Sequence, residues 1–186
     1  MIKITFPDNK VKEFESGITG IEIAKGISSR LAKEVLAVSV NNIVRDVTFP
    51  ITEDARIKLH KWDDTEGKLA FWHSSAHLMA EALESLYPGI KFGIGPTIEN
   101  GFYYDVDLNG QALSENDFPK IEKKMKELAR QKNDFVREDK TKEEAMRYYK
   151  EKGDEYKIEL ISELEDGTIT FYNQGKITDL CRGPHL

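Results

Sequence analysis

The sequence is poor in cysteine and histidine, and it has no long apolar run. Its 186 residues include one cysteine and four histidines. A single cysteine cannot form an internal disulfide, so a small disulfide-stapled scaffold is excluded. No apolar segment approaches the ~20 residues that would span a bilayer, and the start MIKITF has no cleavable signal pattern. We therefore expect a globular cytoplasmic protein with no membrane partner.

An excess of positive charge is also missing. The formal net charge is −6; residues 1–62 carry 10 Lys/Arg and 8 Asp/Glu, so the acidic excess lies in residues 63–186. A surface that is basic throughout is therefore excluded, and an RNA partner would have to contact local patches. One such patch is the segment KIEKKMKELARQK at residues 120–132, whose simpler interpretation is a solvated helix face.

Residues 1–62 alternate short β-type segments with turn residues. Ile2–Phe6 and Val11–Phe14 flank the turn PDN and predict a hairpin. A helix is expected from Thr19 to Ile27, followed by the β-rich VLAVSV and by short strands that end in RIKLH. This order predicts a small ubiquitin-like β-grasp module without a catalytic cluster. Its one histidine, His60, precedes a polar boundary at KWDDTEGK.

Residues 63–186 predict a second domain that mixes helices and hairpins. Apolar residues recur at helical spacing from Leu69 to Tyr87, where Pro88-Gly89 ends the helix. Further helices are expected near residues 114–131 and 141–153. IKFGIG with GFYYDVDL, and YKIELI with TITFYN, predict two hairpins. The fold class is therefore α+β, with an antiparallel sheet packed on helices.

Three of the four histidines and the only cysteine fall into two matching frames. His73 and His77 lie one turn apart on the same side of a predicted helix. Cys181 and His185 repeat this spacing around Gly183-Pro184, which forces a bend. Three imidazoles and a thiol suit tetrahedral zinc. A zinc cage, a hydrolytic pocket and a structural cluster on a buried helix all remain open.

These frames belong to a longer set of motifs. HSSAHLMAEAL, GIGPTIENGFYYDVDL, GDEYKI and DLCRGPH, in that order after a β-grasp module, resemble the amino-terminal region of bacterial threonyl-tRNA synthetases over nearly the whole chain. The resemblance implies a TGS domain at residues 1–62. It also implies an editing domain, the tRNA synthetase second additional domain, at residues 63–186, and this domain normally continues further. The aminoacylation domain of the ligase would be absent.

The activity that the resemblance implies is hydrolysis of the seryl ester on mischarged threonine tRNA. Such editing has a physical reason, because one missing methyl group is worth only ~1–3 kcal/mol and an activation site for threonine cannot exclude serine. A second, smaller site must then reject threonine. It must also deliver water to the ester carbonyl and stabilise the oxyanion that develops.

The resemblance also implies roles for particular residues. His73 would position or activate the water, with Lys157 beside it as the second catalytic residue. Simpler interpretations are a lysine on a sheet face for Lys157, a turn residue for Asp179 and a strand bend for Gly95. The residues that would line the substrate pocket are Gly95, His77, Tyr104, Asp179, Cys181 and His185.

The implied cofactors and partners follow from the same family. Editing would need no cofactor, whereas ATP, Mg and a zinc ion would serve the absent aminoacylation domain. The partners would be the acceptor end of threonine tRNA and the other domains of the synthetase, as a homodimer. Two alternatives stay open: a non-catalytic RNA-binding or regulatory fragment, and an alanyl-type zinc hydrolase with ligands at His73, His77, Cys181 and His185.

Overall fold

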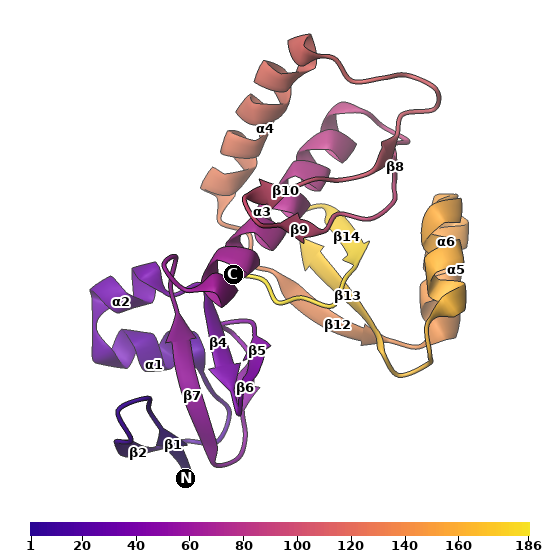
Figure 1. Ribbon diagram of the computed structural model, residues 1–186. Helices are drawn as coiled ribbons and strands as arrows, with labels where there is room; N and C mark the ends of the chain where they lie inside the picture. Colours follow the sequence, from indigo (N-terminus) through magenta and orange to yellow (C-terminus); the bar gives the residue numbers. More distant parts are fainter. The chain divides into compact units, whose positions relative to one another are not determined.

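The computed structural model describes residues 1–186, and it mixes helices with small sheets (Figure 1). The predicted α+β fold class is confirmed. By internal contacts the chain divides into two compact units, which we call unit 1 (Met1–Ser74 with Gly183–Leu186) and unit 2 (Ser75–Arg182). The boundary at residue 62 that the sequence suggests remains a prediction. None of the helices is long and apolar enough to cross a membrane.

Unit 1 is built on a five-stranded sheet with the strand order β2-β1-β7-β4-β5 (Figure 1). The central pair β1 and β7 is parallel, and the other pairs are antiparallel. The strands are β1 (Ile2–Thr5), β2 (Val11–Phe14), β4 (Ala37–Val40), β5 (Ile43–Arg45) and β7 (Ala55–His60), with a separate pair of β3 (Ile18–Thr19) and β6 (Pro50–Ile51).

Two helices pack on this sheet through apolar side chains. Helix α1 (Gly20–Ile27) begins with a capping box between Thr19 and Glu22, and its Ile23 enters the core beside residues of β1 and β7. Helix α2 (Ser29–Glu34) was not predicted. Ser28 ends α1 and also caps α2, because its side chain accepts from the Leu31 N–H.

Helix α3 (Thr65–Leu86) is a single continuous helix of 22 residues. The sequence predicts it from Leu69, and the helix begins one turn earlier. Its later turns bury Ala80 and Leu83 in the core of unit 2, together with Ile90, Phe92, Ile121 and Ile177. The apolar repeat identified this helix because a period of 3.6 residues kept one side apolar.

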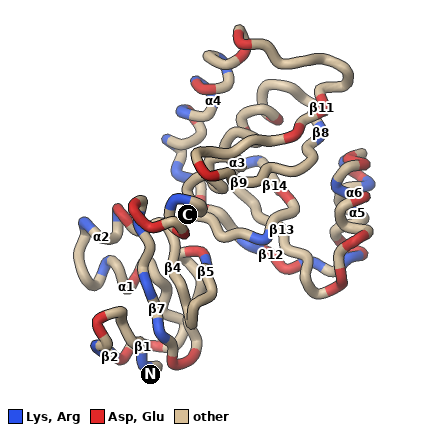
Figure 2. Tube along the Cα trace, in the orientation of Figure 1, with Lys and Arg blue, Asp and Glu red and all other residues tan.

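Unit 2 continues with the hairpin that the sequence predicts after α3. Strands β8 (Lys91–Phe92) and β11 (Val106–Asp107) pair with each other, and the inner strands β9 (Thr97–Ile98) and β10 (Gly101–Phe102) form a second pair. The chain then forms a short 3-10 helix at Glu115–Asp117 and helix α4 (Phe118–Gln131). Figure 2 shows basic residues along the length of α4, which contains most of the basic segment KIEKKMKELARQK.

The remainder of unit 2 is a three-stranded antiparallel sheet with two helices. Strands β12 (Val136–Lys140), β13 (Ile169–Gln174) and β14 (Ile177–Leu180) lie in that order. Helices α5 (Lys142–Lys152) and α6 (Glu155–Glu163) lie side by side in Figure 1. Tyr149 of α5, Ile161 of α6 and Phe171 of β13 share one core.

The sequence predicts a hairpin of YKIELI with TITFYN, and the prediction of its first strand is wrong. Residues 156–161 form helix α6, so Lys157 lies on a helix and not on a sheet face. The alternating apolar residues in YKIELI are typical of a strand. The buried residues are instead Lys157 and Ile161, and a spacing of four residues is that of one helix face. TITFYN does form a strand, and its partners are β12 and β14.

Candidate functional site

The centre of the candidate site in unit 2 is a buried ion pair. The Lys157 ammonium lies 2.7 Å from Oδ1 of Asp179, and the two residues are 3% and 4% exposed. Lys157 comes from α6 and Asp179 from β14, so the pair joins a helix to the sheet. Burying two charges is costly unless each is fully compensated. The surroundings of the pair supply that compensation.

A tight turn between α5 and α6 places Lys157. Gly153 ends α5 with a φ of 70°, a left-handed conformation that glycine adopts without strain. Asp154 follows at once as the cap of α6, and its Oδ1 accepts from the backbone N–H of Lys157. Asp154 is itself buried, and its Oδ2 lies 3.5 Å from the Phe92 N–H donor. The motif GDEYKI is therefore a helix-to-helix corner that aims the lysine inward.

Four donors surround the Asp179 carboxylate. Oδ1 accepts from the Lys157 ammonium, from the Leu180 N–H at 2.8 Å and from the Tyr149 hydroxyl at 3.3 Å. Oδ2 accepts from the hydroxyl of Tyr104. Burial alone would raise the pKa of Asp179, but Lys157, the nearby His77 and the hydrogen bonds from Lys157 and Tyr104 lower it to about 2. The carboxylate is therefore ionised throughout the neutral range.

Tyr104 and Gly95 form a contact that the sequence does not reveal. A Cβ added to Gly95 would lie 2.5 Å from Cε2 of Tyr104, so the ring rests directly on the glycine backbone. Burial, with the Asp179 charge adding to it, raises the pKa of Tyr104 well above its usual value and keeps the phenol protonated. The Lys157 ammonium also lies 5.8 Å from the centre of this ring. Gly95 thus acts by making room for a tyrosine.

His77 and Cys181 are the other predicted site residues in unit 2. His77 is 3% exposed, and its ring lies edge-on to Phe135 with the ring centres 6.2 Å apart. Cys181 directly follows β14, is partly buried and forms no disulfide. Its backbone is fixed to β13, because its N–H donates to the Thr170 carbonyl and its own carbonyl accepts from the Thr170 hydroxyl.

In unit 1, His73 has a defined tautomer. Its Nδ1 lies 3.2 Å from the carbonyl oxygen of Pro184. A carbonyl oxygen only accepts, so Nδ1 carries the proton, and in the neutral ring the lone pair is then on Nε2. An imidazole in this state can accept a proton from water, or bind a metal, through Nε2.

His185 lies against His73 in unit 1 and is fully buried. The two ring centres are 4.2 Å apart and tilted by 31°. Ser74 holds His185 in place: its hydroxyl donates to the Ala70 carbonyl and lies 3.2 Å from Nδ1 of His185. The His185 N–H donates to Asp46 at 2.7 Å. Sequence analysis missed Ser74, although it lies inside the HSSAH motif, and Asp46, for which no local pattern exists.

One group of residues matches the donor set that zinc prefers. His73 and His185 of unit 1 and His77 and Cys181 of unit 2 each offer one ligand atom. Three imidazoles and one thiolate suit tetrahedral zinc. The Nδ1 atoms of His73 and His185 face Pro184 and Ser74, which is the way outer partners orient metal-binding histidines. The three imidazoles and the thiol are therefore compatible with a bound metal ion and also with a pocket that holds no metal.

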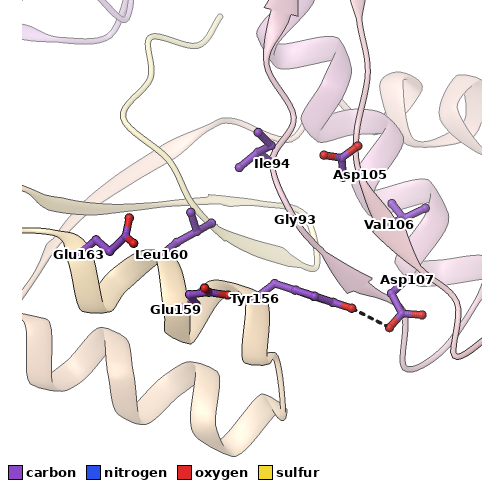
Figure 3. A pocket seen from close by; sticks show the side chains of 9 residues that line it. All are labelled: Gly93, Ile94, Asp105, Val106, Asp107, Tyr156, Glu159, Leu160 and Glu163. Atoms are coloured by element: carbon purple, nitrogen blue, oxygen red, sulfur yellow. Dashed lines mark hydrogen bonds between the residues drawn. The ribbon is translucent and has the colours of Figure 1, made fainter.

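A separate cavity in unit 2 contains none of the predicted residues. It has a volume of about 440 Å³ and lies between α6 and the segment from Gly93 to Asp107. Figure 3 shows its acidic lining, including Asp105, Glu159 and Glu163, and the hydrogen bond of 3.2 Å from Tyr156 to Asp107. Clustered carboxylates repel phosphate, so this cavity is a poor site for the tRNA backbone.

Comparison with known proteins supports the resemblance stated above. Residues 2–61 match the TGS domain. The whole chain is 65% identical to the threonine–tRNA ligase of Parabacteroides distasonis, 64% identical to that of Porphyromonas gingivalis and 60% identical to that of Bacteroides thetaiotaomicron. The chain spans 29% of the length of each of these relatives. The predicted similarity to threonyl-tRNA synthetases is confirmed.

Proposed function

We propose that this chain is part of a threonine–tRNA ligase and that it hydrolyses the seryl ester on mischarged threonine tRNA. Its close relatives are threonine–tRNA ligases, so threonine tRNA is the natural partner. The other parts of such a ligase would supply aminoacylation with ATP, Mg and a zinc ion, and would form a homodimer. The residues of the candidate functional site in this chain would hydrolyse the seryl ester.

The buried cluster of Lys157, Asp179, Tyr104 and Tyr149 is the observation that carries this proposal. A domain of this size gains little stability from a buried ion pair, because desolvation offsets the attraction. Buried charges with displaced pKa values gather at functional sites. The side chains are held by helix α6, strand β14 and the loop at Tyr104, which gives the rigid placement that catalysis needs.

His73 is the proposed base in this reaction. Its Nε2 would accept a proton from water while the water oxygen attacks the seryl carbonyl. When the ester bond to the ribose breaks, the same nitrogen would return the proton to the ribose oxygen. Nδ1 stays protonated throughout because it donates to Pro184. General base catalysis of this kind is worth about 10²–10⁴-fold in rate.

Lys157 is the proposed electrostatic partner. Its ammonium carries donors beyond the one that meets Asp179, and such a donor can stabilise the oxyanion that forms at the ester carbonyl. Asp179 keeps the ammonium in place. We propose that His77, Tyr104, Cys181 and His185 form the walls of the pocket, with Gly95 fixing the Tyr104 ring, and that the walls exclude the extra methyl of threonine.

We propose that the reaction proceeds without a metal ion, since an imidazole and an ammonium supply the base and the positive charge. A zinc-dependent hydrolase is the second candidate, favoured by the donor set of His73, His77, Cys181 and His185. Deacylation before and after treatment with a chelator, with zinc added back, separates the two. Loss of activity that zinc restores would select the second candidate.

A deacylation assay tests the function directly. The chain is incubated with seryl-tRNA and threonyl-tRNA made from threonine tRNA, and in parallel a threonine–tRNA ligase that contains this chain is assayed. We expect release of serine and sparing of threonine. The matched control is seryl-tRNA made from serine tRNA. We expect it to stay charged, because the proposed activity acts on threonine tRNA. Equal release of both amino acids, or of neither by the ligase, would contradict the proposal.

A further inference from the structure

A second polar cluster lies where the sheet of unit 1 meets helix α3. His60 is the last residue of β7, Asp64 precedes the helix and Glu66 is in its first turn. The ring nitrogen of His60 and one oxygen of each carboxylate all lie within 4.8 Å of one another. None of these residues takes part in the proposed editing site. The sequence analysis placed His60 beside a polar boundary, in a module without a catalytic cluster.

His60 is unusual because it is buried but not fully hydrogen-bonded. The residue is 2% exposed, and its Nε2 lies 2.6 Å from the hydroxyl of Ser39 on β4. Its Nδ1 is 3.3 Å from Oε2 of Glu66, but the two atoms are not aligned for a hydrogen bond, and Nδ1 has no other partner. Buried polar atoms without a partner are rare and costly, so this nitrogen requires an explanation.

The surroundings of His60 Nδ1 suit a cation. The hydroxyl of Ser39 can donate to Nε2 or accept from it, so both tautomers of the ring are compatible with this contact. In the tautomer that donates from Nε2 to Ser39, Nδ1 carries a lone pair that faces Oε2 of Glu66 at 3.3 Å. A cation between the two atoms would bind both of them and would select this tautomer.

The geometry points to a divalent zinc site formed by Nδ1 of His60 and the carboxylates of Asp64 and Glu66. Two ligand atoms at 2.0–2.1 Å from a tetrahedral zinc ion lie about 3.3 Å apart. The separation of Nδ1 and Oε2 is also 3.3 Å. Ser39 serves as the outer partner that fixes the tautomer and the ring orientation. The fourth position is open to water, since the Glu66 side chain is 42% exposed.

The charges around the cluster leave room for a cation. Lys58 binds Oδ1 of Asp64 at 2.7 Å, and the Lys61 N–H donates to Oδ2 of the same residue. Each carboxylate oxygen has a second lone pair for a metal. The half-exposed Lys58 side chain can turn into solvent when the ion enters. A bound ion would fasten the end of β7 to the first turn of α3, a junction otherwise held by hydrogen bonds and side-chain packing.

Metal binding by the 186-residue chain tests this site apart from the editing site. His77→Ala/Cys181→Ser removes two donors of the other candidate group, and this double variant serves as the background. Chelator-treated protein is dialysed against zinc at equilibrium. We expect one zinc ion to remain bound in the background variant. Adding Glu66→Gln should weaken that binding more than about 100-fold, because losing even an outer partner costs about 10–100-fold.

Cobalt and a matched glutamate give the controls. Cobalt(II) bound to the background variant should give visible bands, and Glu66→Gln should remove them. Glu53→Gln, an exposed change in the same unit, should leave zinc binding unchanged. Ser39→Ala should weaken it about 10–100-fold. The proposal is overturned if the background variant binds no zinc at micromolar concentration, or if Glu66→Gln leaves its affinity unchanged.

Discussion

Lys157 and Asp179 form an ion pair with 2.7 Å between Nζ and Oδ1, and the two side chains are almost completely buried. The pair brings together a residue of helix α6 and a residue of strand β14 that are 22 positions apart. Although the intact pair adds little net stability, removing one of its charges would leave the other buried and uncompensated, and the pair is also the electrostatic centre of the proposed site. These two roles can be tested separately.

Removing the lysine should destabilise the fold. Lys157→Met keeps most of the side-chain volume but leaves the Asp179 charge buried without its cation. We expect the free energy of unfolding to fall by about 3–5 kcal/mol, measured by urea denaturation. Lys150→Met, the same change at an exposed position of α5, should stay within about 0.5 kcal/mol.

A double variant separates the charge from the packing. Lys157→Met/Asp179→Asn removes both charges, so it should be more stable than Lys157→Met alone. A single variant as stable as the wild type would show that water or another cation already neutralises Asp179. Both proteins are expected to lose seryl-tRNA deacylation, because neither carries the ammonium.

The depressed pKa of Asp179 predicts a pH dependence of stability. Its pKa is about 2 in the folded state and about 3.9 in an unfolded chain. The folded state therefore holds the ionised form, and the resulting stabilisation is complete above about pH 4 and is lost as the pH falls toward 2. Its size is roughly 2 kcal/mol. Between pH 5 and pH 2, the wild type should lose about that much more stability than Asp179→Asn.

Parallel denaturation measurements at several pH values check this prediction. The difference between the wild type and Asp179→Asn cancels the titration of the other carboxylates, provided that both unfold in a two-state transition. A difference that stays constant from pH 5 to pH 2 would show that the carboxylate has an ordinary pKa.

The sequence predicts the elements of this fold better than it predicts the contacts of the site. Helix α3 and the β-grasp strands follow from apolar periodicity and turn residues. Helix α6 was mistaken for a strand because alternating apolar residues outweighed two local signals. Those signals were Gly153, which can end a helix, and Asp154, which can begin one.

The contacts of the site depend on distant segments. The spacing of His73 and His77 follows from one helix, so the sequence alone fixes it. The pairing of Lys157 with Asp179 requires α6 and β14 to meet, and the role of Tyr149, whose hydroxyl accepts from the Leu180 N–H, has no signal in the sequence. Gly95 could be predicted as a close approach, but its partner Tyr104 could not.

Gly95→Ala tests that close approach. The new methyl group would overlap the Tyr104 ring, so the ring must move away from Asp179 or the backbone must shift. We expect a loss of about 1–3 kcal/mol in unfolding free energy and slower deacylation of seryl-tRNA. Gly26→Ala is the matched control. Gly26 lies in α1 with open space around its Cα, so alanine should stabilise the helix by about 0.5–1 kcal/mol.

The two nitrogens of His73 allow its proposed chemical role to be separated from its structural role. Asn places a side-chain N–H near the position of Nδ1, so His73→Asn can keep the hydrogen bond to Pro184 while lacking a base at Nε2. His73→Ala loses both. If Nε2 accepts the proton of water, both variants should deacylate seryl-tRNA about 10²–10⁴-fold more slowly. Only His73→Ala should also lose stability, by about 1 kcal/mol, for the missing hydrogen bond.

Rates and stabilities measured on the same preparations decide between the two roles. A ligase that contains this chain should retain aminoacylation in both variants, which excludes general damage to the protein. Deacylation by His73→Asn near the wild-type rate would mean that His73 only anchors the segment at Pro184. The general base would then have to be another residue. A slow His73→Asn with wild-type stability would show that the hydrogen bond to Pro184 is not enough for activity and that the imidazole ring with its Nε2 is required, because asparagine replaces neither.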